Sequence, residues 1–470
     1  MSQFRLARIS LLLAAIGLNA APALAPAAFA QEKAAPAAAT KADSIRPEMF
    51  KLLDPVKVKE LMAAKKYDEL QANITTAEAF ANPTPYESYV INRMKLALGS
   101  STGNDKMAMT ALELVINSGR VDPKDNAEFI QALGNYHYNA KDYAKAIEWY
   151  KRYQKDSSTP EKVRGNMIRA QYLGNEFAPA KVELEKVIAE DEKAGKKPTL
   201  EDLRLLASVH VKLKDMDAYS GVMEKLVLHY PSDEFWTDMV RRTTAKPTFS
   251  NRLQLNVYRL ESAALKEMAP EEYIEMTELA LQEGFFTEAK KAMDAGYAKG
   301  VLGKGANAAK HKQLLDKATR GAADDAKNIG AGEAGAAAAK VGLPLVKLGY
   351  AYVTMDQFDK GIALMEKGIA KGGLKNLDDA KLLLGVAFAK AGRKPDALKV
   401  FETLKGNDGM SDLAKYWTMY LNAPAPSAAG MAASPSASTV TAAAEPAAPE
   451  AAPAAAPAKA GAKAPAKKKQ

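Results

Sequence analysis

The sequence repeats one pattern of small and large apolar residues at intervals close to 34 residues, and this repetition constrains the fold more than any other feature. In residues 127–158, Gly134 and Ala146 are small, while Ile130, Leu133 and Tyr150 are large. Small residues let two helices cross closely, and large residues fill the space beside the crossing. We therefore expect helix pairs that stack along the chain, so that 470 residues need not divide into several globular domains.

Further copies of the pattern follow at similar spacing. The step from Gly134 to Ile168 is 34 residues, and the step from Gly349 to Gly385 is 36 residues. Clear copies cover residues 168–187, 203–226, 273–293, 345–365 and 384–404. A degenerate copy is expected at 235–265, and weaker pairs are expected at 56–80 and 86–118. Together these copies predict about eight helix pairs.

Residues 127–158 resemble a tetratricopeptide repeat (TPR), whose pattern has Leu-Gly, Ala and an aromatic residue at the places of Leu133-Gly134, Ala146 and Tyr150. His137 departs from the pattern, because an aromatic residue such as Tyr is usual there. The resemblance covers residues 127–404 and implies an all-α fold. That fold is a TPR-type α-solenoid, a right-handed superhelix of antiparallel helix pairs, with disordered N- and C-terminal segments.

The first 30 residues have the form of a secretory signal peptide. A short basic segment with Arg5 and Arg8 precedes an apolar run, and Ala28-Phe29-Ala30 has the small-x-small form of a cleavage site. We expect cleavage after Ala30, a linker at 31–42 and a periplasmic location. The alternative is an uncleaved membrane anchor, although the apolar run is shorter than the ~20 residues that span a bilayer and prolines interrupt it.

The other end, residues 422–470, is rich in Ala, Pro, Ser and Lys and has too few large apolar side chains to fold. It is interpreted either as a solvated tail or as a tether that touches cell-wall polymer or anionic lipid. The two ends carry more than half of the net charge of +9, so the repeats are not basic enough to indicate a nucleic-acid partner.

Between the ends, the expected domains are an N-terminal part of the solenoid at 43–298, a Gly-, Ala- and Lys-rich region at 299–341, and C-terminal TPR pairs at 342–421. The middle region departs from the repeat pattern. It is either a degenerate helical pair or a joint, and we favour helices with a mobile segment near Gly330 to Gly335, because glycine weakens helices.

Catalytic and metal-binding chemistry has little support. The chain has no cysteine and only four histidines, and no phosphate-binding, zinc-protease or serine-hydrolase fingerprint. His137 and His210 occupy equivalent packing positions, so we expect core imidazoles. Glu261-Ser262 resembles the Glu-Ser motif of lytic transglycosylases, but the Gly-Leu-Met-Gln segment of that family is missing, and Glu261 is predicted to be a surface residue. No metal, cofactor or small-molecule substrate is expected.

The first helix of each pair lines the concave face of a TPR solenoid, where extended partners bind. Asn135 and Asn166 match the two asparagines of the TPRs that grip a peptide carboxylate, but the basic residues of that clamp do not match. Asparagine can still hydrogen-bond an extended backbone. The alternative is that these positions are only solvated helix faces. The candidate peptide-binding residues are Gln131, Asn135, Tyr138, Asn139, Asn166, Arg169, Tyr172, Arg204 and Lys212.

The function that these features favour is an exported, non-catalytic TPR scaffold or adaptor that binds protein partners of the bacterial cell envelope. Resemblance to other exported TPR proteins implies a role accessory to an envelope machinery, with TonB-type energised transport as an example. The alternative is a cell-wall (peptidoglycan)-active enzyme, or an activator of one.

Overall fold

A computed structural model describes residues 43–423, and the secondary structure of this part consists of helices and short turns with no strand. The expected signal peptide (1–30), the linker (31–42) and nearly all of the tail (422–470) lie outside the described residues. Within residues 43–423, no helix combines the length and the apolar character that crossing a membrane requires.

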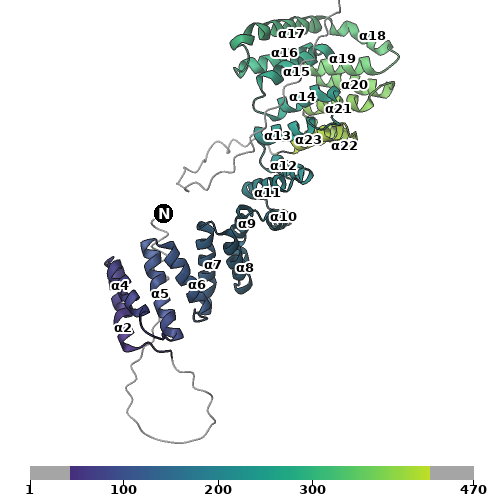
Figure 1. Ribbon diagram of the computed structural model, residues 1–470. Coiled ribbons are helices and arrows are strands. Elements are labelled where there is room, and N and C mark those ends of the chain that lie inside the picture. The colour runs from purple at the N-terminus through teal and green to yellow at the C-terminus, as the bar shows by residue number, and fades with distance from the viewer. Residues whose placement is uncertain (1–42, 424–470) are drawn as a thin grey trace, which may run out of the picture. The chain divides into compact units, whose positions relative to one another are not determined.

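The helices follow one another with short connections (Figure 1). The first are α2 (Pro47–Leu53), α3 (Pro55–Ala63), α4 (Tyr67–Glu78), α5 (Pro85–Thr102), α6 (Asp105–Asn117), α7 (Pro123–Asn139), α8 (Tyr143–Asp156), α9 (Arg164–Leu173), α10 (Phe177–Lys193), α11 (Leu200–Leu213) and α12 (Met216–His229). The later ones are α13 (Asp233–Thr244), α14 (Gln254–Ala264), α15 (Pro270–Glu283), α16 (Phe286–Ala298), α17 (Ala308–Asn328), α18 (Gly332–Ala338), α19 (Leu343–Thr354), α20 (Phe358–Lys371), α21 (Leu377–Lys390), α22 (Lys394–Glu402) and α23 (Met410–Asn422).

Several helices begin at residues whose side chains satisfy the free N–H groups of the first turn. Thr84 starts α5, where the Glu87 N–H donates to Thr84 Oγ1 (3.1 Å) and the Thr84 N–H donates to Glu87 Oε2 (2.9 Å). Asp142 and Asp215 accept from backbone N–H groups at the starts of α8 and α12. Such caps stop one helix and start the next within a few residues, which produces antiparallel pairs.

Neighbouring helices pack in the pairs α5/α6, α7/α8, α9/α10, α11/α12, α13/α14, α15/α16, α19/α20 and α21/α22. The sequence therefore predicted the repeat correctly. The small residues lie at the crossings: a Cβ at Gly134 would come within 2.7 Å of the Tyr150 ring, and one at Gly385 within 2.4 Å of the Phe401 ring. The pair α19/α20 is closer still, because a Cβ at Gly349 would lie 2.5 Å from the carbonyl oxygen of Gly361.

The Gly-, Ala- and Lys-rich region contains two helices, α17 and α18, joined by a short 3-10 turn at Ile329–Ala331. Helix α17 packs on α16, where Gly321 lets the Phe286 ring approach, and α18 packs on α19. Residues 300–304 form a loop before the 3-10 turn Gly305–Asn307, and Gly300, Gly303 and Gly305 have positive φ.

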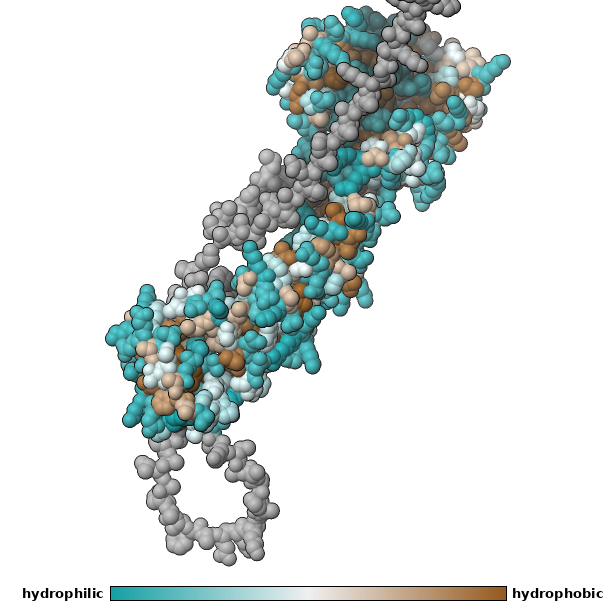
Figure 2. Space-filling view, in the orientation of Figure 1, coloured by the Kyte–Doolittle hydropathy of each residue, from teal (hydrophilic) through white to brown (hydrophobic). Residues whose placement is uncertain are grey.

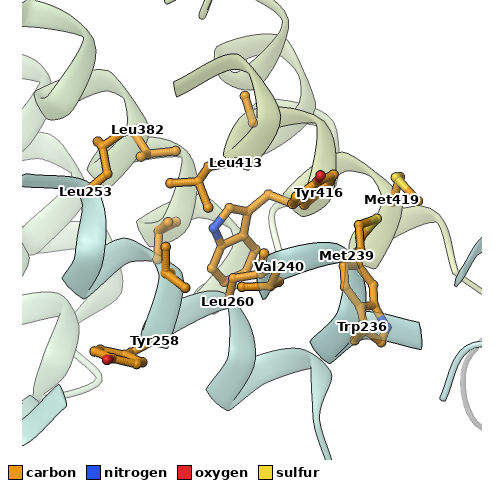
Figure 3. Close-up of a cluster of buried hydrophobic side chains, with 14 of the residues drawn as sticks. Trp236, Met239, Val240, Leu253, Tyr258, Leu260, Leu382, Leu413, Tyr416 and Met419 are labelled. Atoms are coloured by element: carbon orange, nitrogen blue, oxygen red, sulfur yellow. The ribbon is translucent and has the colours of Figure 1, made fainter. Parts of the chain in front are cut away.

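The array also makes a contact between segments distant in sequence that the repeat pattern does not predict. The last described helix, α23, packs against α13 and α14, where Leu413 lies near Val240, Leu253 and Leu260 (Figure 3), and Trp417 belongs to the same buried cluster. Tyr416 and Thr243, 173 residues apart, share a buried hydrogen bond of 2.6 Å between their hydroxyl oxygens.

Ion pairs surround this contact. Lys246 Nζ lies 2.8 Å from Asp412 Oδ2, and Lys415 Nζ lies 2.6 Å from Glu224 Oε1. Helix α23 thus covers a face of α13 and α14 that would be covered by a following repeat in an open array. The segment from α13 to α23 therefore returns on itself instead of extending as an open row of pairs.

Candidate functional site

The nine candidate residues lie on three successive first helices, α7, α9 and α11. We call this surface the first-helix face and define it by Gln131, Asn135, Tyr138, Asn139, Asn166, Arg169, Tyr172, Arg204 and Lys212. Asn139, Arg204 and Lys212 are exposed, and the other six are partly buried. All nine thus lie on helices that can share a surface.

Hydrogen bonds cross from one first helix to the next on this face. Asn135 Oδ1 accepts from the Tyr150 hydroxyl (2.8 Å) and from Asn166 Nδ2 (3.3 Å), which joins α7, α8 and α9. Burial raises the pKa of Tyr150 well above its ordinary value, so the hydroxyl stays protonated and donates. The carbonyl of Asn135 is therefore occupied, and its amide group remains the part available for a peptide backbone.

Between α9 and α11, and between α11 and α13, the interacting side chains carry charges or hydroxyl groups. Arg169 donates to Glu201 Oε1 through Nε (2.9 Å) and Nη2 (2.6 Å), and Tyr172 and Ser208 share a hydrogen bond of 2.6 Å. Arg204 Nη2 donates to Glu234 Oε2 of α13 (3.2 Å).

These ion pairs are exposed. Because exposed ion pairs stabilise a fold by only about 0–1 kcal/mol, a partner carboxylate can replace Glu201 or Glu234 at small cost. Gln131, Asn139 and Lys212 have no side-chain partner among the described residues. The face thus offers amide and guanidinium donors to an extended partner.

The same register positions are apolar and largely buried in the pairs α19/α20 and α21/α22. Relative to Gly134, Gln131 lies three residues earlier, Asn135 one residue later and Tyr138 four residues later. The residues at the same offsets from Gly349 are Val346, Tyr350 and Val353. All three are buried, as are Leu382 and Val386 around Gly385. Helices α19 and α21 therefore lack this polar face. The change from polar to apolar residues is visible in the sequence.

A buried charged network lies within the later part of the array and was missed at the sequence level. Arg259 of α14 donates to Glu288 of α16 through Nε (2.9 Å to Oε1) and Nη2 (2.7 Å to Oε2). The Tyr350 hydroxyl donates to Glu288 Oε1 (2.8 Å), and Arg259 Nη1 donates to Asn256 Oδ1 (2.8 Å).

Burial disfavours the charged form of Glu288, but the charge and hydrogen bonds of Arg259 outweigh it and hold the pKa of Glu288 below its ordinary value. Burial raises the pKa of Tyr350, so its hydroxyl keeps the proton that it donates to Glu288. Every charge in this network has a partner, which indicates a structural role in holding α14, α16 and α19 together.

The prediction that Glu261 is a surface residue was wrong. It is only 6% exposed, because α14 is covered by neighbouring helices on several sides, and Oε2 has no hydrogen-bond partner among the described residues. Burial, with a smaller contribution from the charge of Glu272, raises the pKa of Glu261 to about 8. Glu261 is therefore a neutral acid at pH 7.

The histidines agree with the prediction of core imidazoles. His137 and His210 are each 2% exposed, and each lies near the aspartate that caps the following helix: His137 Nδ1 is 3.3 Å from Asp142 Oδ2, and His210 Nδ1 is 3.5 Å from Asp215 Oδ2. Among residues 43–423, no group of three or more His, Asp or Glu side chains is arranged to hold a metal ion.

Comparisons with known proteins return no matching family model and no matching curated protein. Solved structures of TPR proteins do match. The TPR2AB-domain:pHSP90 complex of yeast Sti1 is 15% identical, and the match covers 63% of this chain and 97% of that one, with a TM-score of 0.22. A tetratricopeptide repeat protein from Parabacteroides merdae is 12% identical, covering 70% and 98%, with a TM-score of 0.25. Yeast Tom70 is 11% identical, covering 80% and 88%, with a TM-score of 0.18.

TM-scores this low do not establish a common arrangement of the repeats, and they carry no information about partners. The class of the fold follows from the helix pairs themselves. Small residues at the crossings, aromatic residues beside them and capped turns between them define an all-α solenoid of TPR-type helix pairs.

Proposed function

We propose that the protein is a non-catalytic scaffold that binds an extended segment of a protein partner along the first-helix face. The observation that carries this proposal is the row of polar groups on α7, α9 and α11, at positions that are apolar and largely buried in α19 and α21. In a helix array, a row of polar residues is found only where the row stays in contact with water or with a partner.

The chemistry of the face favours a peptide backbone with acidic side chains. Asparagine amides hydrogen-bond backbone carbonyls, and Arg169 and Arg204 can exchange their exposed glutamates for carboxylates of the partner. We further propose that the protein is exported to the periplasm and serves an envelope machinery, with TonB-type energised transport as one such machinery. The signal-like N-terminus and the lysine-rich tail, which touches cell wall or anionic lipid in this proposal, support that location.

Crosslinking in intact cells tests the binding face. A photoreactive residue replaces Tyr138 or Arg169 in the full chain, and a matched control replaces Glu185, which is exposed on the second helix α10. The expected result is one discrete crosslinked partner from Tyr138 and Arg169 that is absent from Glu185. Equal crosslinking from Glu185, or partners captured only from the tail, would show that the first-helix face is not the binding element.

One observation favours the alternative of a cell-wall-active enzyme. Glu261 holds a proton at neutral pH, which is a property of general acids. Its side chain is nearly inaccessible, however, so a polymer has no route to it in this arrangement. Release of soluble fragments from labelled cell wall by the purified protein, abolished by Glu261→Gln, would establish the enzyme and refute the scaffold.

A further inference from the structure

A second candidate site lies well away from the first-helix face. A cavity of about 500 Å³ that is open to solvent is bordered by the ends of α15 and α17 and by parts of α18 and α19. Figure 2 shows a hollow in the upper part of the view, over the helices that Figure 1 labels α15 to α19. A volume of this size lies within the range of small-ligand pockets and holds one large side chain with room to spare.

One wall of the cavity is apolar. Phe285 is buried at the start of α16, while Ile329 after α17 and Leu348 of α19 are partly buried and border the same space. A ligand in this cavity must therefore present aliphatic or aromatic surface to that wall.

The other wall is negative. Helices α15 and α17 both end at the cavity, and the carboxyl end of a helix favours a positive charge. Glu283 and Asp325 add two carboxylates. Lys347 pairs with Glu283 (2.7 Å), whereas Asp325 has no ion-pair partner among the described residues. Burial and the neighbouring Asp324 raise the pKa of Asp325, which is the response of a carboxylate that lacks a cation.

Two glycines of α18 border the cavity, and the fold does not require glycine at either position. A Cβ at Gly335 would meet no atom within 4 Å, and one at Gly332 would meet only Leu348 at 4.0 Å. Neither residue has positive φ. Gly335 lies inside α18, where glycine costs about 1 kcal/mol of stability relative to alanine, and both glycines leave the space beside them unfilled.

We propose that this cavity binds a lysine or arginine side chain from an extended segment of a partner protein. The aliphatic part of the side chain packs on Ile329 and Leu348, and its cationic end pairs with Asp325. An apolar side chain would leave the partly buried carboxylate of Asp325 without a partner, and an acidic one would be repelled. This inference goes beyond the first-helix face, and it stands whether or not that face binds a partner.

Saturation-transfer difference NMR on the full chain tests the proposal with the peptide acetyl-Ala-Ala-Lys-Ala-Ala-amide. Matched peptides carry arginine, glutamate or norleucine at the centre, and norleucine keeps the aliphatic stem of lysine without its charge. We expect saturation of the lysine and arginine stems and affinity about tenfold lower for norleucine, because a charged hydrogen bond is lost. Equal binding of norleucine or glutamate would overturn the proposal.

Two variants test whether the peptide binds in this cavity. Asp325→Asn is expected to weaken binding of the lysine peptide about tenfold, while Asp324→Asn, which removes an exposed neighbouring charge, retains it. Gly335→Leu fills the cavity and abolishes binding, whereas Gly221→Leu, at an exposed glycine of α12 with equally open surroundings, does not. Unchanged binding in Asp325→Asn refutes the site even if Gly335→Leu fails to fold.

A third variant tests whether the cavity is free for a partner or is occupied by the tail of the same chain. It replaces the five tail lysines by alanine: Lys459, Lys463, Lys467, Lys468 and Lys469. If the lysine peptide binds the full chain as well as it binds this variant, the cavity is free for a partner. If it binds only the variant, the tail occupies the cavity, and the proposal of a partner side chain is wrong.

Discussion

Replacing Glu261 by glutamine is expected to remove a pH-dependent weakness of the C-terminal part. The folded protein holds the pKa of Glu261 at about 8, against an ordinary value of 4.5. Below pH 4.5 the carboxyl is protonated in both the folded and the unfolded chain, so it has no effect on their balance. Between pH 4.5 and 8 only the unfolded chain releases the proton, so the folded state loses stability as the pH rises.

The size of the effect follows from the two pKa values. Each pH unit within that range costs about 1.4 kcal/mol, so the wild-type protein is weakened by about 3 kcal/mol at pH 7. Glutamine has a similar shape and does not titrate. Its amide adds a donor that must be accommodated, which shifts stability by a constant amount at every pH. The diagnostic quantity is therefore the slope: the advantage of Glu261→Gln over wild type should grow by about 3 kcal/mol between pH 5 and 8.

Urea unfolding at four pH values from 5 to 8 measures this slope. Trp236 of α13 and Trp417 of α23 lie next to α14, so in a Trp149→Phe background their fluorescence reports the relevant part of the array. Glu267→Gln is the control, because the side chain of Glu267 is exposed and should leave the pH dependence of wild type unchanged. Parallel curves for wild type and Glu261→Gln would refute the reasoning.

The remaining predictions concern other contacts in the same part of the array. Glu288→Leu should lower the free energy of unfolding by about 3–5 kcal/mol, because it leaves Arg259 buried and unpaired, and adding Arg259→Met should recover much of the loss in urea unfolding. Tyr416→Phe should cost about 1–2 kcal/mol in the transition that tryptophan fluorescence reports, since the hydroxyl of Thr243 loses its buried partner. Gly349→Ala should cost about 1–3 kcal/mol by overpacking, whereas the same change at an exposed helical glycine should be neutral or stabilising; equal effects at the two positions would contradict the close crossing of α19 and α20.

The sequence predicted local packing well and long-range packing poorly. The Gly134–Tyr150 contact was expected, because a small residue and an aromatic one at fixed spacing describe a single crossing within one pair. The contact between Tyr416 and Thr243 was not expected, because the repeat pattern describes only neighbouring pairs. The burial of Glu261 was missed because the repeat pattern does not show how fully the neighbouring helices cover α14.

The candidate site likewise contains contacts that the sequence predicted and contacts that it did not. The register of the repeat places Asn135 and Asn166 on adjacent first helices, and their side chains do hydrogen-bond across that step. The pairing of Arg169 with Glu201 depends on the rotamers of two long side chains, which no spacing rule fixes. The cavity beside Asp325 was not predicted at all, since it lies in the region where the repeat pattern fails.

The return of α23 to α13 has a consequence for synthesis of the chain. Thr243 leaves the ribosome 173 residues before Tyr416. At about 5–20 residues per second, α13 and α14 wait on the order of 10–30 s for the helix that covers them. During that interval the face formed by Val240, Leu253 and Leu260 is exposed to water and to other nascent chains, so this part of the protein completes its fold only after α23 has emerged, whereas each earlier pair can fold as soon as its neighbour emerges.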